Sequence, residues 1–315
     1  MSNATVSRLG QASGAGDANA LFLKIYAGEV LSMFDRENQM LGMTTVRTIK
    51  QGHSAKFPVT GSIASSYHTI GNEILGTAVQ HAEKVINIDD MLLAHAFIGE
   101  IDELKAEYEV RSIYSKEMGF ALARTVDKHL INLVVHGSQA SATISGVTQG
   151  GKDLIDADAD TSATSLIDSI FECIQVLDEK DIPTSDRFVV VKPDQYYQLC
   201  NVDKLTSRDF SRKPSDFGAG TVVSIGGVPV IKSNSAVDAF TTQSAVTGEN
   251  NTYAHDGQNH VAVIFHKSGV GTVKLKDMVI ESTYDARRLG TLMTARLALG
   301  SAYLRPEACA AIKTA

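Results

Sequence analysis

The clearest hydrophobic pattern in this chain lies near its C-terminal end, where apolar and polar residues alternate over residues 268–281. Val273 and Leu275 fall on one face of an extended segment, and the lysines that follow each of them fall on the other. This period of two is expected of a half-buried strand. Residues 292–299 repeat the alternation, so the pattern predicts two adjacent antiparallel strands.

A second pattern predicts a hairpin near the N-terminal end. Two β-prone runs, at residues 44–49 and 54–59, are separated by Gln51-Gly52. Residues 60–80 contain three glycines and few large apolar residues, so they offer little to cover the hairpin. Because an isolated two-stranded hairpin is marginally stable in water, we expect it to lie on its own domain or on a neighbouring copy. Residues 81–89 then return as a strand.

The longest periodic signal predicts a helix. Apolar residues recur at spacings of three and four between Asp102 and His136, with charged residues on the opposite face. Such a helix would be about 50 Å long at 1.5 Å per residue. Gly137 is expected to end it as a C-terminal glycine cap.

The middle of the chain is typical of a small inserted α/β domain. A polar loop or short hairpin over residues 137–160 is followed by alternating helices and strands. The expected elements are a helix over 162–179, a strand over 187–191, a helix starting at Pro193, and strands over 228–231 and 260–265. Residues 236–259, rich in Ser, Thr, Asn and Gly, are expected to form a surface loop.

The N-terminal residues predict an arm rather than a leader sequence. Residues 1–18 are small and polar, and Asn19 is expected to cap a helix that runs to about Phe34. This region lacks the apolar core of a signal peptide. No run in the chain approaches the ~18 apolar residues of a transmembrane helix, so we expect a soluble cytosolic product.

Composition narrows the class further. The chain has 315 residues, 43% of them hydrophobic, which is enough for one large or two medium globular domains. A net charge of -7 argues against a dedicated nucleic-acid binder, which would carry a basic excess on one face. The three cysteines are odd in number and scattered, so they predict neither a disulfide framework nor a zinc site.

Sequence motifs for chemistry are incomplete. The run Asp-Ala-Asp-Ala-Asp at residues 156–160 begins like a calcium loop, but Thr161 and Ile167 stand where the glycine and the bidentate glutamate belong. We therefore expect Asp160 or Thr161 to cap the next helix. Gly218-Ala-Gly220 lacks the third glycine of a nucleotide-binding loop, and Ser224 lacks the glycine of a nucleophile elbow. We predict no catalytic residue, no cofactor-binding residue and no metal ligand.

Two basic groups remain. Arg47, Lys50 and Lys56 lie on the expected hairpin, and Arg208, Arg212 and Lys213 lie in a polar loop. A solubilising face is the simpler interpretation of both groups. The alternative is that they complement an acidic surface on a neighbouring copy of the chain.

In the order of its parts the chain resembles the major capsid proteins of short-tailed bacteriophages, whose fold is shared by tailed-phage and herpesvirus shells. The resemblance spans nearly the whole chain, and it rests on the colinearity of short segments rather than on one decisive motif. These are Ala-Leu-Phe-Leu-Lys (20–24), Gly-Glu-Val-Leu (28–31), Ser-Ala-Lys-Phe-Pro-Val (54–59), His-Ala-Glu-Lys-Val-Ile-Asn-Ile-Asp (81–89), Tyr-Glu-Val-Arg-Ser (108–112), Gly-Gly-Val-Pro-Val-Ile (226–231), the alternating residues 268–281 and Leu-Arg-Pro-Glu-Ala (304–308).

The resemblance implies an α+β, tailed-phage capsid fold in five parts. They are an N-terminal arm and helix (1–42), an extended hairpin loop (43–80), a peripheral domain with a long spine helix on an antiparallel sheet (81–137), an inserted α/β axial domain (138–266), and the terminal strands of the peripheral domain (267–315). The extended loop would overlap the adjacent subunit, whose surface would supply the missing core. Phe57 thus joins the six basic residues as a candidate subunit-interface residue.

The implied function is structural. The chain would assemble into hexamers and pentamers of an icosahedral phage head that encloses double-stranded DNA. Its partners would be other copies of itself, a scaffolding protein and a portal during assembly, and packaged DNA through non-specific contact, with no cofactor and no membrane. Assembly is expected in the host cytoplasm and the final location in the virion. The alternatives are the shell protein of a cellular nanocompartment and an α/β enzyme that uses residues 160–265.

Overall fold

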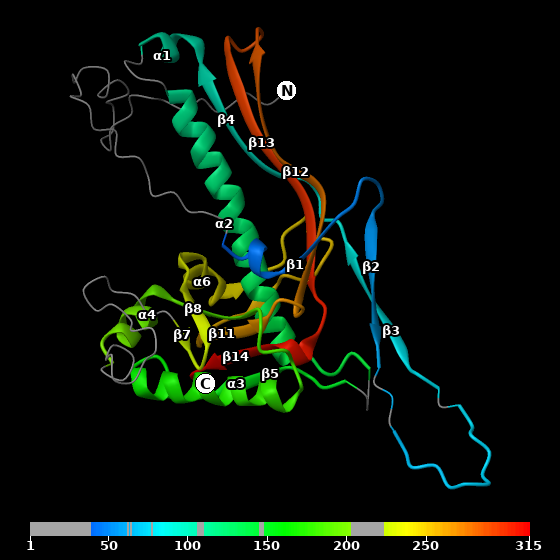
Figure 1. The fold of residues 1–315 in the computed structure, drawn as a ribbon. Helices are drawn as coiled ribbons and strands as arrows, with labels where there is room; N and C mark the ends of the chain where they lie inside the picture. Colours follow the sequence, from blue (N-terminus) through cyan, green and yellow to red (C-terminus); the bar gives the residue numbers. More distant parts are fainter. Residues whose placement is uncertain are drawn as a thin grey trace. The chain divides into compact units, whose positions relative to one another are not determined.

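A computed structural model of the protein describes residues 39–61, 63, 65–76, 78–105, 110–144, 148–202 and 224–315 (Figure 1). The described chain divides into two compact units. The first comprises residues 90–126 and 276–299, and the second comprises residues 39–89, 127–275 and 300–315. The predicted N-terminal arm and the helix expected over residues 19–34 lie outside the described residues.

A six-stranded mixed sheet forms the core of the second unit. Its strands, in spatial order, are β5 (Lys152–Ile155), β14 (Cys309–Lys313), β11 (His260–His266), β6 (Arg187–Val191), β8 (Val228–Lys232) and β7 (Ser224–Ile225). β11 is antiparallel to both of its neighbours, whereas β6 and β8 run parallel. Six consecutive residues of β11 are buried, as expected of a strand covered on both faces. The strands predicted over 187–191, 228–231 and 260–265 are confirmed.

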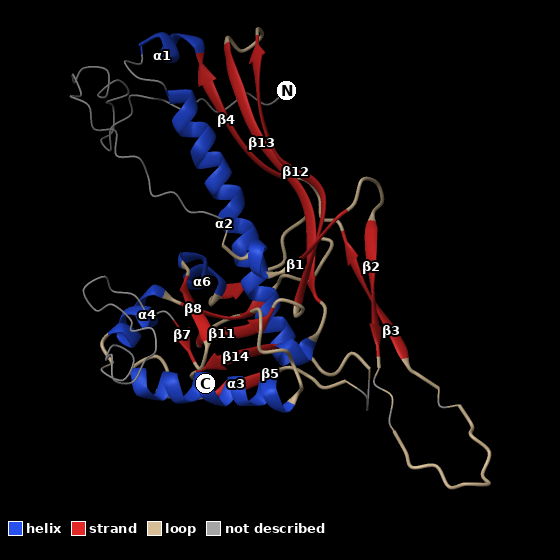
Figure 2. Ribbon diagram, viewed as in Figure 1, coloured by secondary structure: helices blue, strands red, loops and turns tan. Residues whose placement is uncertain are grey.

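Helix α3 (Ala163–Glu179) packs along one face of this sheet (Figure 2). The apolar face of α3 is fully buried; its residues are spaced by three and four positions and are Leu166, Ile170, Cys173 and Leu177. The next helix, α4 (Pro193–Cys200), begins with proline at its first position, where the missing N–H has no partner to lose. Both helices confirm their predictions.

The cap of α3 differs from its prediction. Ser162, rather than Asp160 or Thr161, occupies the N-cap position and accepts a hydrogen bond from the backbone N–H of Ser165 at 3.4 Å. Asp156 accepts hydrogen bonds from the hydroxyls of Ser165 and Ser169 at 2.6 and 2.5 Å. These bonds lower the pKa of Asp156 because they favour the carboxylate. The acidic run that resembled a calcium loop thus ties the start of α3 to the chain before it.

A four-stranded sheet has the order β1 (Thr45–Thr48), β12 (Val270–Asp285), β13 (Gly290–Tyr303), β4 (Leu92–Gly99). The division between the two units falls within β12 and β13. In the second unit β1 pairs with β12 in parallel, starting from Thr45 opposite Gly271. In the first unit β13 pairs with β4 in antiparallel register, starting from Gly290 opposite Gly99. The alternation predicted for β13 is confirmed, since Met293, Ala295 and Leu297 are buried and the residues between them are half-buried. In β12 it is not seen, because Thr272 is as fully buried as Val273, and Leu275 is half-buried like the lysines beside it.

The hairpin predicted between residues 44–49 and 54–59 is wrong in its pairing. The first run forms β1 on β12, and the second forms β2 (Ser54–Thr60), which pairs with β3 (His81–Asn87) instead. The backbone N–H of Ile49 continues the ladder to Lys274, so β1 is committed to a strand more than 200 residues away. Alternation identified both strands, but it carries no information about partners.

The predicted long helix is present as α1 (Glu100–Lys105) and α2 (Val110–Gln139), with residues 106–109 outside the described part. The predicted glycine cap is wrong, because α2 continues through Gly137 to Gln139. A Cβ at Gly137 would lie 2.8 Å from Cys309 Sγ on β14. Glycine is therefore required here by close packing of the helix against a strand, and not by a left-handed turn.

Two further expectations need correction. Residues 236–259 are not simply a surface loop: they include part of α6 (Asn234–Ala239), β9 (Thr242–Gln243) and β10 (His255–Asp256), and Tyr253 is 2% exposed. Residues 309–313 were expected among the terminal strands of a peripheral domain, but as β14 they pair with β5 and β11 in the six-stranded sheet. A short strand surrounded by small residues gave no signal of which sheet it would join.

The two glycines of α2 should respond oppositely to alanine. Gly137→Ala would force a Cβ into Cys309, and we expect a loss of about 1 to 3 kcal/mol in the free energy of unfolding. Gly119→Ala meets only the Met278 side chain at 3.7 Å, an ordinary contact, so it should gain about 0.5 to 1 kcal/mol from helix propensity. Urea denaturation of the unassembled subunit measures both. Similar effects from the two variants would contradict the packing argument.

Candidate assembly surface

The candidate surface is built on the two-stranded ribbon β2–β3. The strands are antiparallel and in register from Ser54 opposite Asn87 to Thr60 opposite His81. Residues 61–80 connect them, and residues 62, 64 and 77 of this connection are not described. Because two strands alone are marginal in water, what holds the ribbon in place decides its use.

One face of the ribbon closes a small hydrophobic cluster at its base. Ala55 from β2, Ile86 from β3 and the following Ile88 pack with Val273 of β12 and with Leu304. A Cβ on Gly271 would lie 2.6 Å from Leu304 Cδ1, which shows how closely the strand backbone approaches this cluster. The cluster supplies the apolar cover that the local sequence does not contain.

A polar network anchors the chain where it leaves β3. The Asp89 carboxylate accepts hydrogen bonds from the backbone N–H of Asn250 at 2.8 Å, from Asn251 Nδ2 at 2.9 Å and from the Tyr253 hydroxyl at 2.5 Å. Asn251 Nδ2 also donates to the Asn87 carbonyl at 2.7 Å, and the Tyr253 hydroxyl accepts from Ser301 N at 2.9 Å. Burial raises the pKa of Asp89 and outweighs the opposing effect of these hydrogen bonds.

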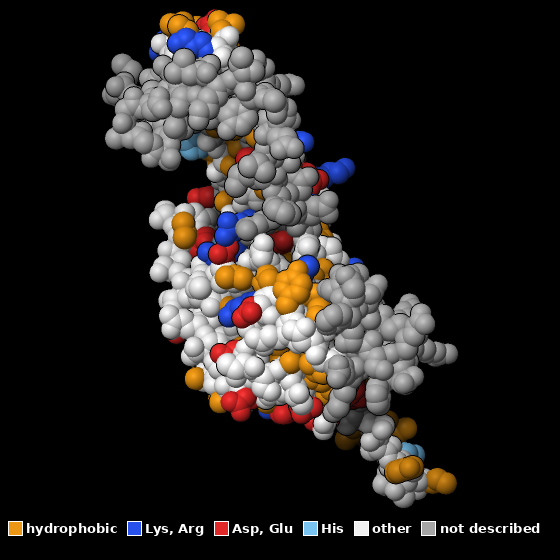
Figure 3. All heavy atoms as spheres, turned by 90° about the vertical axis from the view of Figure 1, so that its left-hand side faces the viewer, with side chains coloured by type: hydrophobic (Ala, Val, Ile, Leu, Met, Phe, Trp, Pro, Cys, Tyr) orange, Lys and Arg blue, Asp and Glu red, His pale blue; other side chains and the backbone are white. Residues whose placement is uncertain are grey.

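The connection beyond the ribbon exposes large apolar side chains. Figure 3 shows hydrophobic side chains on the part of the chain that lies lowest in the view. The exposed fractions are Ile63 70%, Tyr67 106%, Ile70 97%, Ile74 79% and Leu75 79%. Apolar side chains gathered in this way are uncommon on a monomer and typically mark a surface that is covered in an assembly.

The structure brings together three of the predicted interface residues. Arg47 Nη1 donates to the Lys56 carbonyl at 3.2 Å, and its guanidinium lies 5.8 Å from the centre of the Phe57 ring. Lys56 Nζ forms an ion pair with Glu83 Oε1 at 2.7 Å across the ribbon, with both side chains more than half exposed. Lys50 is exposed in the segment between β1 and β2. Arg208, Arg212 and Lys213 lie outside the described residues.

Phe57 has an intramolecular role that the sequence did not predict. It is only half-buried and packs against the cluster at the base of the ribbon. The sequence interpretation also passed over Tyr67, Ile70, Ile74 and Leu75. The sequence feature that could have identified them is a group of large apolar residues in a stretch with Gly and Ser, spaced with the period of neither a helix nor a strand.

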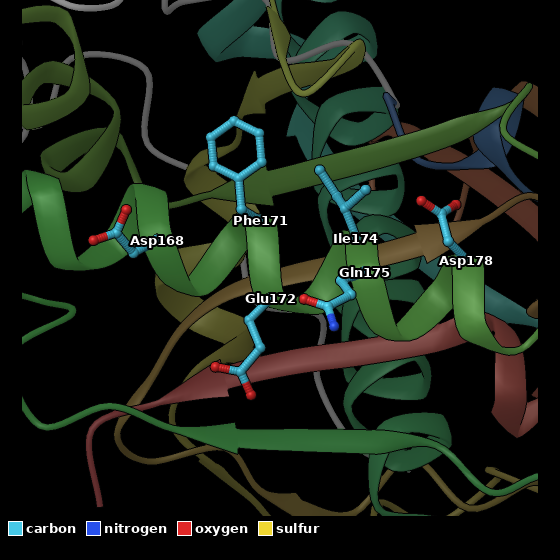
Figure 4. Close-up of a pocket in the computed structure, with 6 residues that line it drawn as sticks. All are labelled: Asp168, Phe171, Glu172, Ile174, Gln175 and Asp178. Carbon is cyan, nitrogen blue, oxygen red and sulfur yellow. The ribbon is translucent and has the colours of Figure 1, made fainter.

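A shallow open pocket lies along the outer side of α3. Figure 4 shows Phe171, Ile174 and Asp178 along one side of it and Glu172 along the other; Asp168 and Gln175 complete the lining. Two of the carboxylates have cationic neighbours, since Asp178 pairs with Arg187 at 2.7 Å and Glu172 lies 3.9 Å from Lys152 Nζ. Phe171 is 48% exposed, so the pocket combines an apolar ring with an acidic rim.

The described residues offer little else that chemistry could use. Within them no group of three or more His, Cys, Asp or Glu side chains is arranged to hold a metal ion. Ser224 is exposed at the start of the two-residue strand β7. No helix in the described part of the chain is long and apolar enough to cross a membrane.

Comparison with known proteins agrees with the resemblance in the sequence. Residues 56–313 match the model of the family described as Gp10A-like, major capsid protein. The chain is 30% identical to the major capsid protein of Escherichia phage T7 over 324 residues, which cover 95% of this chain and 93% of that protein. It is 29% identical to the major capsid protein of Enterobacteria phage T3, covering 96% and 94%. The capsid structure of the cyanophage P-SCSP1u contains a chain with a TM-score of 0.83 and 35% identity, covering 100% of this chain and 99% of that one.

The Asp89 network should be a large contributor to stability. Asp89→Ala would leave the amides of Asn250 and Asn251 and the Tyr253 hydroxyl without their shared acceptor, so we expect a loss on the order of 2 to 4 kcal/mol in the free energy of unfolding. The neighbouring Asp90 is exposed, and Asp90→Ala should change it by less than about 0.5 kcal/mol. Urea denaturation at pH 7 compares the two. Equal effects would show that Asp89 is not an anchor.

Proposed function

Because the chain belongs to the Gp10A-like family of major capsid proteins, we propose that it assembles into the hexamers and pentamers of an icosahedral phage head that encloses double-stranded DNA. The protein is a structural component of a phage capsid, built from many copies of the same chain, and is not an enzyme. The observation that carries the finer proposal is the set of exposed apolar side chains on the connection between β2 and β3.

We propose that this connection is covered by an adjacent subunit. The ribbon is fixed at its base by the cluster around Ile86 and by the Asp89 network, so its outer end is presented rather than folded back. Burying an apolar side chain contributes about 1.5 to 3 kcal/mol, so several of them together offset part of the entropy lost on association. A projecting element received by the next copy is a heterologous contact, the kind that closes into rings and shells.

The remaining assignments follow the same premise. The proposed domain scheme is an arm, an extended loop, a peripheral domain with α2 as spine, and an axial domain that contains the six-stranded sheet. We propose a scaffolding protein and a portal as partners during assembly in the host cytoplasm. A net charge of -7 supports weak, non-specific contact with packaged DNA, because an anionic subunit does not hold phosphates tightly.

The acidic rim of α3 is a candidate counterpart for the second basic group of the sequence. Helix α3 contains no Lys or Arg, and Asp168, Glu172 and Asp178 line its outer pocket. Arg208, Arg212 and Lys213 give the opposite charge within six residues. We propose that these groups meet across the boundary between two subunits of one capsomer.

The apolar connection should be needed for assembly and not for folding. Tyr67→Ser and Ile70→Ser remove side chains that are fully exposed in the subunit, so the free energy of unfolding should change by less than about 0.5 kcal/mol. Shell formation with scaffold, measured by electron microscopy and sedimentation, should fall at least tenfold in the double variant. Asn72→Ser, on the same connection, is the matched control and should assemble normally. Normal shells from the double variant would contradict the role of the connection.

The charge contact can be tested by mixing two variants. One carries Asp168→Lys and Glu172→Lys, and the other carries Arg208→Glu and Arg212→Glu. Each alone places like charges opposite each other, so assembly should be impaired. In an equimolar mixture, alternating neighbours restore opposite charges throughout a hexamer and at all but one contact of a pentamer, so assembly should recover substantially. No rescue in the mixture would argue against a contact between subunits, and normal assembly of each variant alone would argue against any contact.

A further inference from the structure

Three histidines from separate elements meet in the interior of the second unit. His136 lies near the end of α2, His255 begins β10 and His260 begins β11. The ring centres of His136 and His255 are 4.7 Å apart, and those of His255 and His260 are 5.6 Å apart. His255 and His260 are 9% and 2% exposed. Three imidazoles at these distances are compatible only while most of them are neutral.

Hydrogen bonds fix how two of these rings carry their protons. His136 Nε2 lies 2.7 Å from the carbonyl oxygen of Ala254, and a carbonyl can only accept, so this nitrogen bears the hydrogen. His260 Nδ1 lies 3.2 Å from the Gly257 carbonyl oxygen, so by the same reasoning this nitrogen also bears a hydrogen. A neutral His260 then has a bare lone pair on Nε2.

Unpartnered buried atoms surround that lone pair. Among the described residues, His255 Nε2, His260 Nε2 and Asp153 Oδ1 are buried without a hydrogen-bond partner. His260 Nε2 and Asp153 Oδ1 are 3.7 Å apart, and the other oxygen of Asp153 accepts from Lys313 Nζ at 2.8 Å.

The same stretch of chain reaches the anchor of the ribbon. His129, two turns before His136 on α2, stacks on Tyr253 with ring centres 4.3 Å apart and planes 14° from parallel. Glu249 Oε1 lies 3.4 Å from His129 Nε2. Tyr253, with Asn250 and Asn251, holds Asp89 at the end of β3. Residues 249–256 therefore join two histidine contacts on α2 to the base of the ribbon.

We propose that residues 249–256 form an acid-sensitive latch, in which neutral His136 and His255 hold the segment on α2 and their protonation, which would set two cations side by side, releases it together with the Asp89 anchor of the β2–β3 ribbon. His129 is not part of the switch, because its protonation would pair it with Glu249 of the same segment. The latch is a property of the single subunit. Its consequence for assembly, loosening of the ribbon that a neighbour receives, rests on the proposed function.

The charges around the histidines set the direction of the response. Burial lowers the pKa of His255 to about 4, and the neighbouring His136 and His260 add to this effect. The carboxylates of Asp153 on β5 and Asp256 on β10 oppose this for His255 but do not outweigh burial. Burial also lowers the pKa of His136, against its hydrogen bond to Ala254.

The sign of the pH effect follows by linkage. A histidine whose pKa is lower in the closed latch than in the open one binds fewer protons when closed, so closure weakens as the pH falls from about 6.5 towards 4. Asp89 and Asp127 act in the opposite sense, because burial raises their pKa values, that of Asp127 to about 6. Comparing histidine variants with the wild type at each pH cancels these carboxylates.

Hydrogen exchange on the unassembled subunit tests the latch. In the wild type, after correction for intrinsic rates, amides of β3 and of residues 249–256 should open more often at pH 5 than at pH 7, by about 20-fold for each histidine whose pKa moves from about 6.5 to about 4. His255→Phe keeps a ring between His136 and His260 without titrating, and His255→Gln is the alternative if the phenyl ring does not fit. Either variant should reduce the acceleration roughly 10- to 20-fold.

His53→Gln is the matched control, because His53 is exposed and should leave the acceleration unchanged. Equal acceleration in the wild type and in both His255 variants would overturn the latch. Because exchange is measured on single subunits, these outcomes do not depend on whether the chain forms shells. Failure of shell assembly with an intact pH response would instead count against the proposed function alone.

Discussion

The partly buried Asp89 carboxylate is the group on whose hydrogen bonds the presentation of the β2–β3 ribbon depends. A two-stranded ribbon has too little core to fix its own direction, and only one of its faces packs on the cluster around Ile86. Asp89 ends β3 with hydrogen bonds to three residues that lie more than 160 positions later in the sequence. The donors are the backbone N–H of Asn250, the side-chain amide of Asn251 and the hydroxyl of Tyr253, and together they restrict the carboxylate to one orientation. Gly300 fits the same requirement, since a Cβ there would overlap the Asn87 carbonyl.

Much of the local structure could be predicted from the sequence, because period and capping are local properties. The alternation around Met293 and the spacing of Leu166, Ile170 and Leu177 each reflect a single face that must be buried. Pairing could not be predicted in the same way. β1 pairs with β12 and not with the nearby β2, and β14 belongs to the six-stranded sheet. Neither pairing could be predicted, because each depends on a surface assembled from distant segments. Gly137 was misread for the same reason, as its neighbour is Cys309 and not the following turn.

The candidate assembly surface could likewise be predicted from the sequence only in part. The sequence indicated that the segment around Phe57 lacked local cover, and the structure shows that this cover comes from Val273 and Leu304 of the same subunit. It did not distinguish Phe57, which packs on its own subunit, from Tyr67 and Ile70, which are fully exposed. The sequence alone does not show whether an apolar side chain is buried within its own subunit or exposed on the subunit surface. Only exposure in the folded subunit separates the two, and residues without helix or strand periodicity are the ones for which sequence gives least warning.

The ribbon therefore separates two physical tasks along its length. Its base uses directional hydrogen bonds and a small closed cluster, which fix an orientation and are costly to leave half-made. Its outer end uses exposed apolar side chains, which are non-directional and gain free energy against any complementary apolar surface. If the base were apolar and the outer end polar, the ribbon could collapse onto its own subunit. Placing the specific interactions inside the subunit and the adaptable ones outside would let one chain meet neighbours in slightly different geometries, as the proposed pentamers and hexamers require.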